Sequence, residues 1–155
     1  MNRFMLIISF VILVLFSSVL YSSTHRSNIE SAVVTNPLTD ASEVTRVVKL
    51  TQVDNMFLPA EVTVSTGEVI QFVIKNGGNK RHEMLIGDKT DLKKYAKMRR
   101  MFPDKDLSEY GSILLEPGEQ KELIWKFDHA GTVEFACPLP GHFKKMRGII
   151  FVEKK

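Results

Sequence analysis

Four side chains of this sequence carry the donor atoms of a metal site. Cys137 is the single cysteine, four residues separate it from His142, and three more separate His142 from Met146. His82 supplies a second imidazole from a predicted strand far upstream. One thiolate, two imidazoles and a weak thioether are the ligand set of a mononuclear type 1 copper site. These four residues are therefore the predicted ligands of one copper ion.

This donor set suits the transfer of single electrons. Thiolate and thioether sulfur favour Cu(I), whereas imidazole suits both oxidation states. A trigonal plane of two imidazoles and one thiolate, with a weak axial thioether, lies between the geometries that Cu(I) and Cu(II) prefer, so little has to move when an electron arrives. The residues therefore predict a redox-active copper site.

Each residue also has a simpler interpretation, which the sequence leaves open. Cys137 could be a buried core thiol, since a free cysteine behaves as a small hydrophobic residue. His82 could be a surface histidine, and Met146 could be ordinary core packing. Met98 and Met101, on a predicted helix, are expected to pack rather than to bind copper.

The elements that must position these residues have mostly the two-residue period of β-strands. Alternation places Cys137 on the inward face of its strand, so we expect the thiolate at the end of the core. The following loop, 138–141, contains two prolines that stiffen it and a glycine that allows close backbone approach. This loop is predicted to turn His142 and Met146 back over the thiolate.

Short strands with one inserted helix predict an all-β fold, an antiparallel β-sandwich or Greek-key barrel. The helix is expected over about 90–102, with Asp88 or Thr90 as its N-cap. Its apolar face is predicted to consist of Leu92, Tyr95, Met98 and Phe102. The predicted strands cover residues 44–53, 61–64, 69–74, 82–86, 112–115, 121–127, 132–137 and 148–152.

The composition fits one compact domain. A chain of 155 residues favours a single domain. The formal charge of +3, from 21 basic and 18 acidic residues, is too balanced for a nucleic-acid-binding protein. A single cysteine excludes an intramolecular disulfide, a zinc ribbon or an iron–sulfur cluster supplied by this chain alone.

Residues 1–22 have the layout of a secretory signal peptide, because Arg3 precedes an apolar run that ends in small and polar residues. The alternative is an uncleaved membrane anchor, since 5–21 is almost long enough to span a bilayer. Both place the rest of the chain outside the cytoplasm, in the periplasm, either free or tethered to the membrane. Residues 23–42, rich in Ser, Thr and Asn, are predicted to be a flexible linker before a folded domain at 43–155.

The folded domain, about 43–155, resembles the cupredoxins, the small blue copper proteins that include azurin and plastocyanin. The Cys-x4-His-x3-Met-x-Gly spacing, ending at Gly148, is most similar to azurin. The Ala-Cys-x-x-Pro-Gly-His-Phe run and the inserted helix resemble azurin-like cupredoxins exported by bacteria, some of them associated with copper tolerance. The resemblance implies a β-sandwich with one type 1 copper ion. Glu83 is a departure, because azurins place after the first histidine an asparagine that helps to hold the thiolate.

Our first hypothesis for the function is an exported one-electron carrier that cycles between Cu(I) and Cu(II). The alternative is a periplasmic protein that sequesters or delivers copper in copper tolerance, and the same ligands would serve both. No enzyme is predicted, because a ligating thiolate is not free to act as a nucleophile and no substrate site is evident.

The expected partner is a redox protein, such as an acidic cytochrome. His142 is predicted to reach the surface inside an apolar collar of residues 139–143, and the protein is expected to be a monomer that contacts a membrane only through an uncleaved N-terminal segment. If the two ligand loops meet, the collar carries a basic rim, although ordinary solvated cations are the alternative. The rim consists of Lys80, Arg81, Lys144, Lys145 and Arg147.

Overall fold

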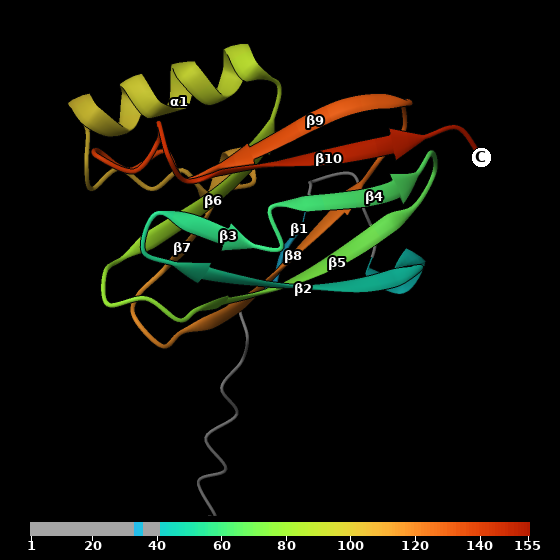
Figure 1. Ribbon diagram of the computed structural model, residues 1–155, viewed down its shortest axis with the longest axis horizontal. Coiled ribbons are helices and arrows are strands. Elements are labelled where there is room, and N and C mark those ends of the chain that lie inside the picture. Colours follow the sequence, from blue (N-terminus) through green and yellow to red (C-terminus); the bar gives the residue numbers. More distant parts are fainter. Residues whose placement is uncertain (1–32, 36–40) are drawn as a thin grey trace, which may run out of the picture.

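The computed structural model describes residues 33–35 and 41–155. They form two five-stranded sheets with one α-helix beside them (Figure 1). The strand order is β1-β8-β5-β2-β3 in the first sheet and β4-β10-β9-β6-β7 in the second. The prediction of an all-β sandwich with one inserted helix is confirmed.

The strands agree closely with the predicted ranges. The first sheet consists of β1 (Val33–Thr35), β8 (Gln120–Lys126), β5 (Val69–Asn76), β2 (Arg46–Val53) and β3 (Met56–Leu58). The second consists of β4 (Glu61–Ser65), β10 (Arg147–Glu153), β9 (Gly131–Ala136), β6 (His82–Gly87) and β7 (Ile113–Leu115). The helices are α1 (Lys89–Met101) and the 3-10 turns η1 (Ala41–Glu43) and η2 (Ser108–Tyr110).

Both sheets are mixed, which corrects the expectation of an antiparallel sandwich. β2 runs parallel to β5, with Arg46 opposite Ile70, and β10 runs parallel to β4, with Ile149 opposite Glu61. The chain passes from the first sheet at β3 to the second at β4, so strands distant in sequence become neighbours. Alternation predicts which face a strand buries, and it carries no information about the direction of the neighbouring strand.

Two short strands were not predicted. β3 pairs with the end of β2. β1 lies within the predicted linker 23–42 and pairs in parallel with β8, where three β-branched residues use an edge that would otherwise be unpaired. The remainder of that linker up to residue 40, and the predicted signal peptide 1–22, lie outside the described residues. Within the described residues, no helix is long and apolar enough to cross a membrane.

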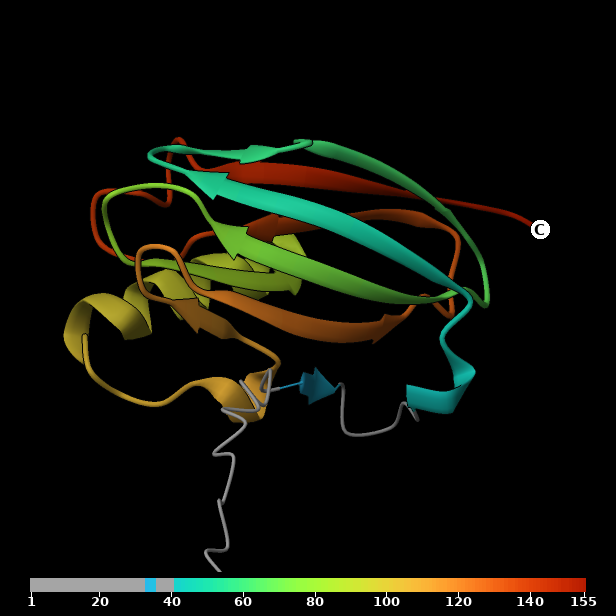
Figure 2. The ribbon, with the colours of Figure 1, turned by 90° about the horizontal axis from the view of Figure 1, so that it is seen from below.

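The core between the sheets ends at the predicted copper ligands. Phe135 and Cys137 are both 0% exposed, so the predicted inward face of β9 is confirmed. Ala136 points to the other side of the sheet, where it is buried with Leu92 of α1. In Figures 1 and 2, α1 lies at the same end of the sandwich as the loops that precede β6 and follow β9.

Helix α1 covers the predicted range, and the side chain of Asp88 caps it as expected. Its buried face differs from the prediction, because the buried residues are Leu92, Ala96 and Arg99. Phe102, expected on that face, is 55% exposed. An apolar period could not predict a buried face that contains an arginine, since arginine is rarely buried without a partner.

Gly148 is expected to be required for the contact between β10 and β9. A Cβ atom at this position would overlap the ring of Phe135 and lie 2.6 Å from the carbonyl oxygen of Ala60. We predict that Gly148→Ala lowers the free energy of unfolding by about 3 kcal/mol, a typical upper value for overpacking. Gly87→Ala is the matched control, since its Cβ would lie 3.7 Å from the nearest atom, in ordinary contact. Equal urea midpoints for the two variants would contradict this prediction.

Candidate metal centre

The predicted ligands come together from separate parts of the chain. His82 begins β6, Cys137 directly follows β9, and His142 lies in the loop before β10. One donor atom from each of the three lies within 4.8 Å of the others. The imidazole rings of His82 and His142 are 4.9 Å apart between centroids. The structure therefore brings the two predicted imidazoles and the predicted thiolate together.

One ring nitrogen of His82 is hydrogen-bonded, and the other is available to bind a metal ion. Its Nε2 atom lies 2.9 Å from Oδ1 of Asp54, in the turn between β2 and β3. Its Nδ1 atom is buried and has no hydrogen-bond partner among the described residues. The Asp54 carboxylate favours the tautomer with the proton on Nε2, which leaves a lone pair on Nδ1. A bound metal ion would satisfy this buried atom, which otherwise costs about 1–3 kcal/mol.

The contact between Asp54 and His82 depends on a glycine. A Cβ atom on Gly78 would lie 2.5 Å from Oδ1 of Asp54 and 3.0 Å from Nε2 of His82. The side chain of Asn76 holds this loop, because it accepts from the Gly78 N–H and donates to the carbonyl oxygen of Lys80. The hydrogen bond from His82 also lowers the pKa of the Asp54 carboxyl. Sequence analysis missed Asp54, since an Asp-Asn pair at a turn is common without any site nearby.

The thiol of Cys137 is buried and hydrogen-bonded. Its Sγ atom lies 3.6 Å from Nδ1 of His142 and accepts a hydrogen bond from the Glu83 N–H at 3.4 Å. Burial raises the pKa of this thiol to about 11, although backbone hydrogen bonds from Glu83 and Leu139 act in the opposite direction. In the metal-free protein at neutral pH, Cys137 is therefore a thiol rather than a thiolate.

Backbone hydrogen bonds fold the loop 137–146 over the thiol. The Cys137 N–H donates to the carbonyl oxygen of Met146, and the Met146 N–H donates to that of His142. Gly141 has a φ of +85°, in the left-handed region that favours glycine. Met146 is 0% exposed and belongs to the same core cluster as Cys137. All four predicted ligands thus lie at one end of the sandwich.

His142 is the one predicted ligand that reaches the surface. His82, Cys137 and Met146 are fully buried, whereas His142 is partly exposed. Burial, followed by electrostatic interactions with His82 and Lys80, lowers the pKa of His142 below its ordinary value. Its imidazole is therefore neutral at neutral pH and able to act as a ligand.

Glu83 stands where azurins have an asparagine after the first histidine, and its side chain forms different contacts. Its backbone N–H still reaches the sulfur of Cys137. Its side chain is fully buried and forms an ion pair with Arg99 of α1. Sequence analysis missed this pair, because both residue types are usually solvated and they lie sixteen residues apart.

A buried thiol, two imidazoles and a buried thioether fit copper better than harder ions, which prefer oxygen ligands. Together with the two-sheet fold, this donor set defines the class of type 1 copper proteins. The chain belongs to the cupredoxin family, since residues 9–152 match the family model described as a cupredoxin-like domain. Copper is the cofactor of this class.

Two named relatives are similar to this chain in sequence. One is the copper-resistant cuproprotein CopI of Rubrivivax gelatinosus, 40% identical over 106 residues, which are 68% of this chain and 64% of the relative. Another is CopI of Vibrio cholerae, 37% identical over 82 residues, which are 53% of this chain and 48% of the relative. The chain therefore matches about half to two thirds of the length of these two relatives.

Solved structures of blue copper proteins share the fold. Auracyanin A of Chloroflexus aurantiacus has a TM-score of 0.59 at 21% identity and covers 69% of this chain and 98% of its own. An azurin of Methylomonas sp. strain J has a TM-score of 0.53 at 18% identity and covers 71% of this chain and 99% of its own. At these identities the likeness shows the fold alone.

The raised pKa of Cys137 predicts how many protons copper binding releases. Because the thiol titrates at about 11 rather than 9.0, it stays protonated at pH 9 and must lose its proton when it becomes a ligand. We expect release of about one proton per copper at pH 9, where a thiol with a pKa of 9.0 would release about half. Calorimetry in two buffers of different ionisation enthalpy measures this number. A value of about one half or less at pH 9 would contradict the buried, protonated thiol.

Proposed function

We propose that this protein binds one copper ion through His82, Cys137, His142 and Met146 and contributes to copper tolerance outside the cytoplasm. The observation that carries the proposal is the buried cluster of His₂Cys donors within 4.8 Å of one another. Its chain is 40% identical over 106 residues to a copper-resistant cuproprotein. Sulfur and imidazole ligands bind copper in either oxidation state, so a buried site of this kind can withdraw the ion from other reactions.

The burial of the ligands favours tight binding of copper and exchange of the ion only at the exposed side of the site. His82, Cys137 and Met146 are enclosed by protein, and only the imidazole of His142 is partly exposed. A copper donor or acceptor would therefore meet the site at His142. This supports sequestration or delivery of copper as the role of the protein.

The electron carrier, our first hypothesis from the sequence, becomes the second candidate. The specific observation in its favour is that the two imidazoles and the thiol already lie together. A trigonal site built from these donors would require little movement when an electron arrives. The fold likeness to auracyanin and azurin does not decide between the two functions. The named relatives favour copper tolerance.

We also infer that the protein is exported and acts by binding rather than by catalysis. The predicted signal peptide supports export, with the uncleaved anchor as the alternative. The single cysteine of the chain is a predicted ligand, so it is not available for nucleophilic chemistry.

A gene deletion with complementation tests the proposal. Loss of the gene is expected to make the native host sensitive to copper, wild-type protein should restore growth, and Cys137→Ser should fail to restore it. Full restoration by Cys137→Ser, at equal protein abundance, would overturn the copper-binding basis of tolerance. With purified protein, transfer of copper to a chelator would support sequestration or delivery, whereas reversible reduction with complete copper retention would support the carrier.

We propose that the partner is an acidic protein that docks around His142. A pocket of about 240 Å³ borders this loop, with an apolar floor that includes Leu139 and Phe143 and with cations at Arg100, Lys144 and Lys145. Arg147, expected in the same rim, pairs with Glu134 and lies over the Phe143 ring, so its charge is partly neutralised.

The paired change of Lys144→Glu and Lys145→Glu is expected to slow copper or electron exchange with the native partner by about tenfold or more at low salt. The reason is that complementary charges accelerate encounter more than they tighten a complex. The loss should shrink at high salt, because exposed charges are screened. Stopped-flow rates at two ionic strengths measure the effect, and the copper spectrum should stay unchanged. Rates that respond neither to salt nor to these charges would leave the apolar floor as the docking surface.

A further inference from the structure

Arg99 is buried and forms hydrogen bonds through all three guanidinium nitrogens, which is unusual for a residue on a surface helix. Its Nε and Nη2 atoms donate to the two carboxylate oxygens of Glu83, at 2.9 and 2.6 Å. Its Nη1 atom donates to the carbonyl oxygens of Pro103 and Lys105, at 2.9 and 2.6 Å. The guanidinium thus joins α1, β6 and the loop after α1 in one rigid, forked contact.

The partner of Arg99 is also the residue that contacts the predicted copper thiolate. Glu83 follows His82 in the chain, and its N–H donates to Sγ of Cys137 at 3.4 Å. The pairing of β6 with β9 covers only Leu85 to Gly87. On the other side of β6, Glu83 pairs with Leu114 of β7. On the β9 side, its N–H donates to the Cys137 sulfur and strand pairing begins only at Leu85.

We infer that Arg99 is a positioning residue for the copper ligand Cys137, and that it acts through Glu83. The guanidinium fork fixes the Glu83 side chain, and the Glu83 backbone in turn holds its N–H on the sulfur. A buried ion pair contributes little net stability, because desolvation offsets the attraction, so a role in holding geometry accounts better for its presence here. The inference rests on the copper site proposed above and not on the tolerance function.

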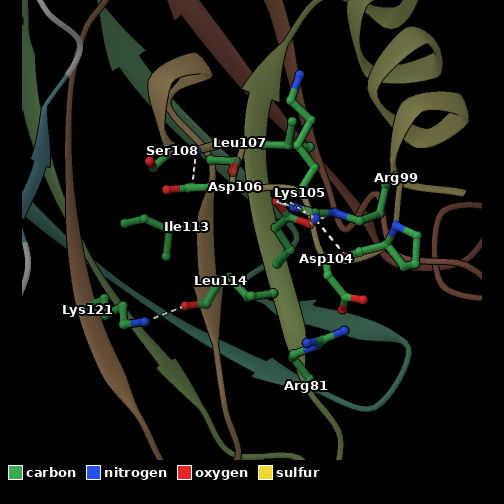
Figure 3. A pocket seen from close by; sticks show the side chains of 13 residues that line it. Arg81, Arg99, Asp104, Lys105, Asp106, Leu107, Ser108, Ile113, Leu114 and Lys121 are labelled. Atoms are coloured by element: carbon green, nitrogen blue, oxygen red, sulfur yellow. Dashed lines mark hydrogen bonds and ion pairs between the residues drawn. The ribbon is translucent and has the colours of Figure 1, made fainter. Parts of the chain in front are cut away.

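A pocket lies beside the ion pair of Glu83 and Arg99. This pocket of about 490 Å³ is lined by Glu83 and Arg99 together with residues of the loop 103–108. Figure 3 shows Arg99 extending from the helix to line this pocket, with Asp104 and Lys105 nearby. Without the guanidinium, the unpaired carboxylate of Glu83 has room to turn toward the water in this pocket. Only the pairing with β7 would then hold the Glu83 N–H toward the sulfur, so this hydrogen bond should become weaker and more mobile.

The hydrogen bond to the sulfur should affect the copper site in a defined direction. A donor at the thiolate favours the reduced site, in which the sulfur carries more negative charge, and hydrogen bonding at this sulfur tunes the potential of blue copper sites. Loss of Arg99 weakens that donor and leaves a nearby negative charge on Glu83. Both effects lower the reduction potential.

The test compares Arg99→Gln with Lys97→Gln, an exposed cation on the same helix, in the full chain. For Arg99→Gln with copper bound we expect a lower reduction potential, a shifted thiolate-to-copper absorption band and copper affinity reduced by about 10-fold or more. For Lys97→Gln the absorption band should be unchanged. Arg99→Lys should rescue only in part, since an ammonium keeps the charge and lacks the fork.

Two further measurements separate positioning from charge and from folding. The double variant Glu83→Gln with Arg99→Gln removes the unpaired buried charge. If Arg99 acts by positioning Glu83, the absorption band of this double variant stays shifted. In the metal-free protein, the Glu83 amide should exchange with deuterium at least tenfold faster in Arg99→Gln, relative to the Leu85 amide. A wild-type band and wild-type exchange in Arg99→Gln would overturn the inference, and so would full restoration of the band in the double variant.

Discussion

Cys137→Ser is expected to abolish the intense visible colour of the oxidised, copper-loaded protein. That colour arises from charge transfer between a thiolate and Cu(II), and a hydroxyl cannot supply the soft anionic sulfur. Since Cys137 is the single cysteine, no other thiolate of this chain can replace it. Absorption spectra of wild-type and variant protein, each with one equivalent of Cu(II), measure the effect.

Cys137→Ser is a conservative change for the fold, because serine is close to cysteine in size and the sulfur lies where the core ends. Circular dichroism of the variant should therefore remain that of a β-sandwich. A Cys137→Ser protein that keeps the colour would contradict the assignment of the thiolate.

His82→Ala and Met146→Leu are expected to have very different effects. Removal of His82 opens one of the three strong positions and leaves Asp54 without its imidazole partner, so the site should be lost or its spectrum strongly changed. Met146→Leu preserves the volume of a fully buried side chain and removes only a weak donor, so copper and colour should remain. The reduction potential should rise, because Cu(I) is satisfied by the three strong donors, whereas Cu(II) gains more from a fourth donor even when that donor is soft.

Copper titration and voltammetry on the same two variants measure these effects. Equal loss of copper from His82→Ala and Met146→Leu would contradict the role of Met146 as a weak axial ligand. A Met146→Leu protein with an unchanged potential would mean that the thioether belongs to the core alone.

The strands and the ligand cluster could be predicted because their signals are local. Period-two alternation identified most strands, and the spacing from Cys137 to Met146 described a loop whose own backbone hydrogen bonds fold it. His82 was predicted from a strand 55 residues upstream of Cys137, with the help of the family resemblance. The structure places these residues together at the end of the core.

The features that were not predicted depend on polar contacts between distant segments. Asp54 reaches His82 from a turn 28 residues away, and only the space left by Gly78 permits this. Arg99 is buried because Glu83 neutralises it, whereas a sequence pattern assigns both to solvent. The parallel strand pairs were not predicted either. They depend on the path of the chain between the sheets, and this path does not affect the alternation of apolar and polar residues along a strand.

A crystal structure of the copper-loaded protein, with anomalous scattering recorded at the copper edge, tests the central claim most directly. We predict one strong anomalous peak, within bonding distance of Nδ1 of His82, Sγ of Cys137 and a ring nitrogen of His142, with the sulfur of Met146 on the axial side. A peak bound elsewhere, such as at the exposed Met101 of α1, with these four side chains unliganded, would contradict it.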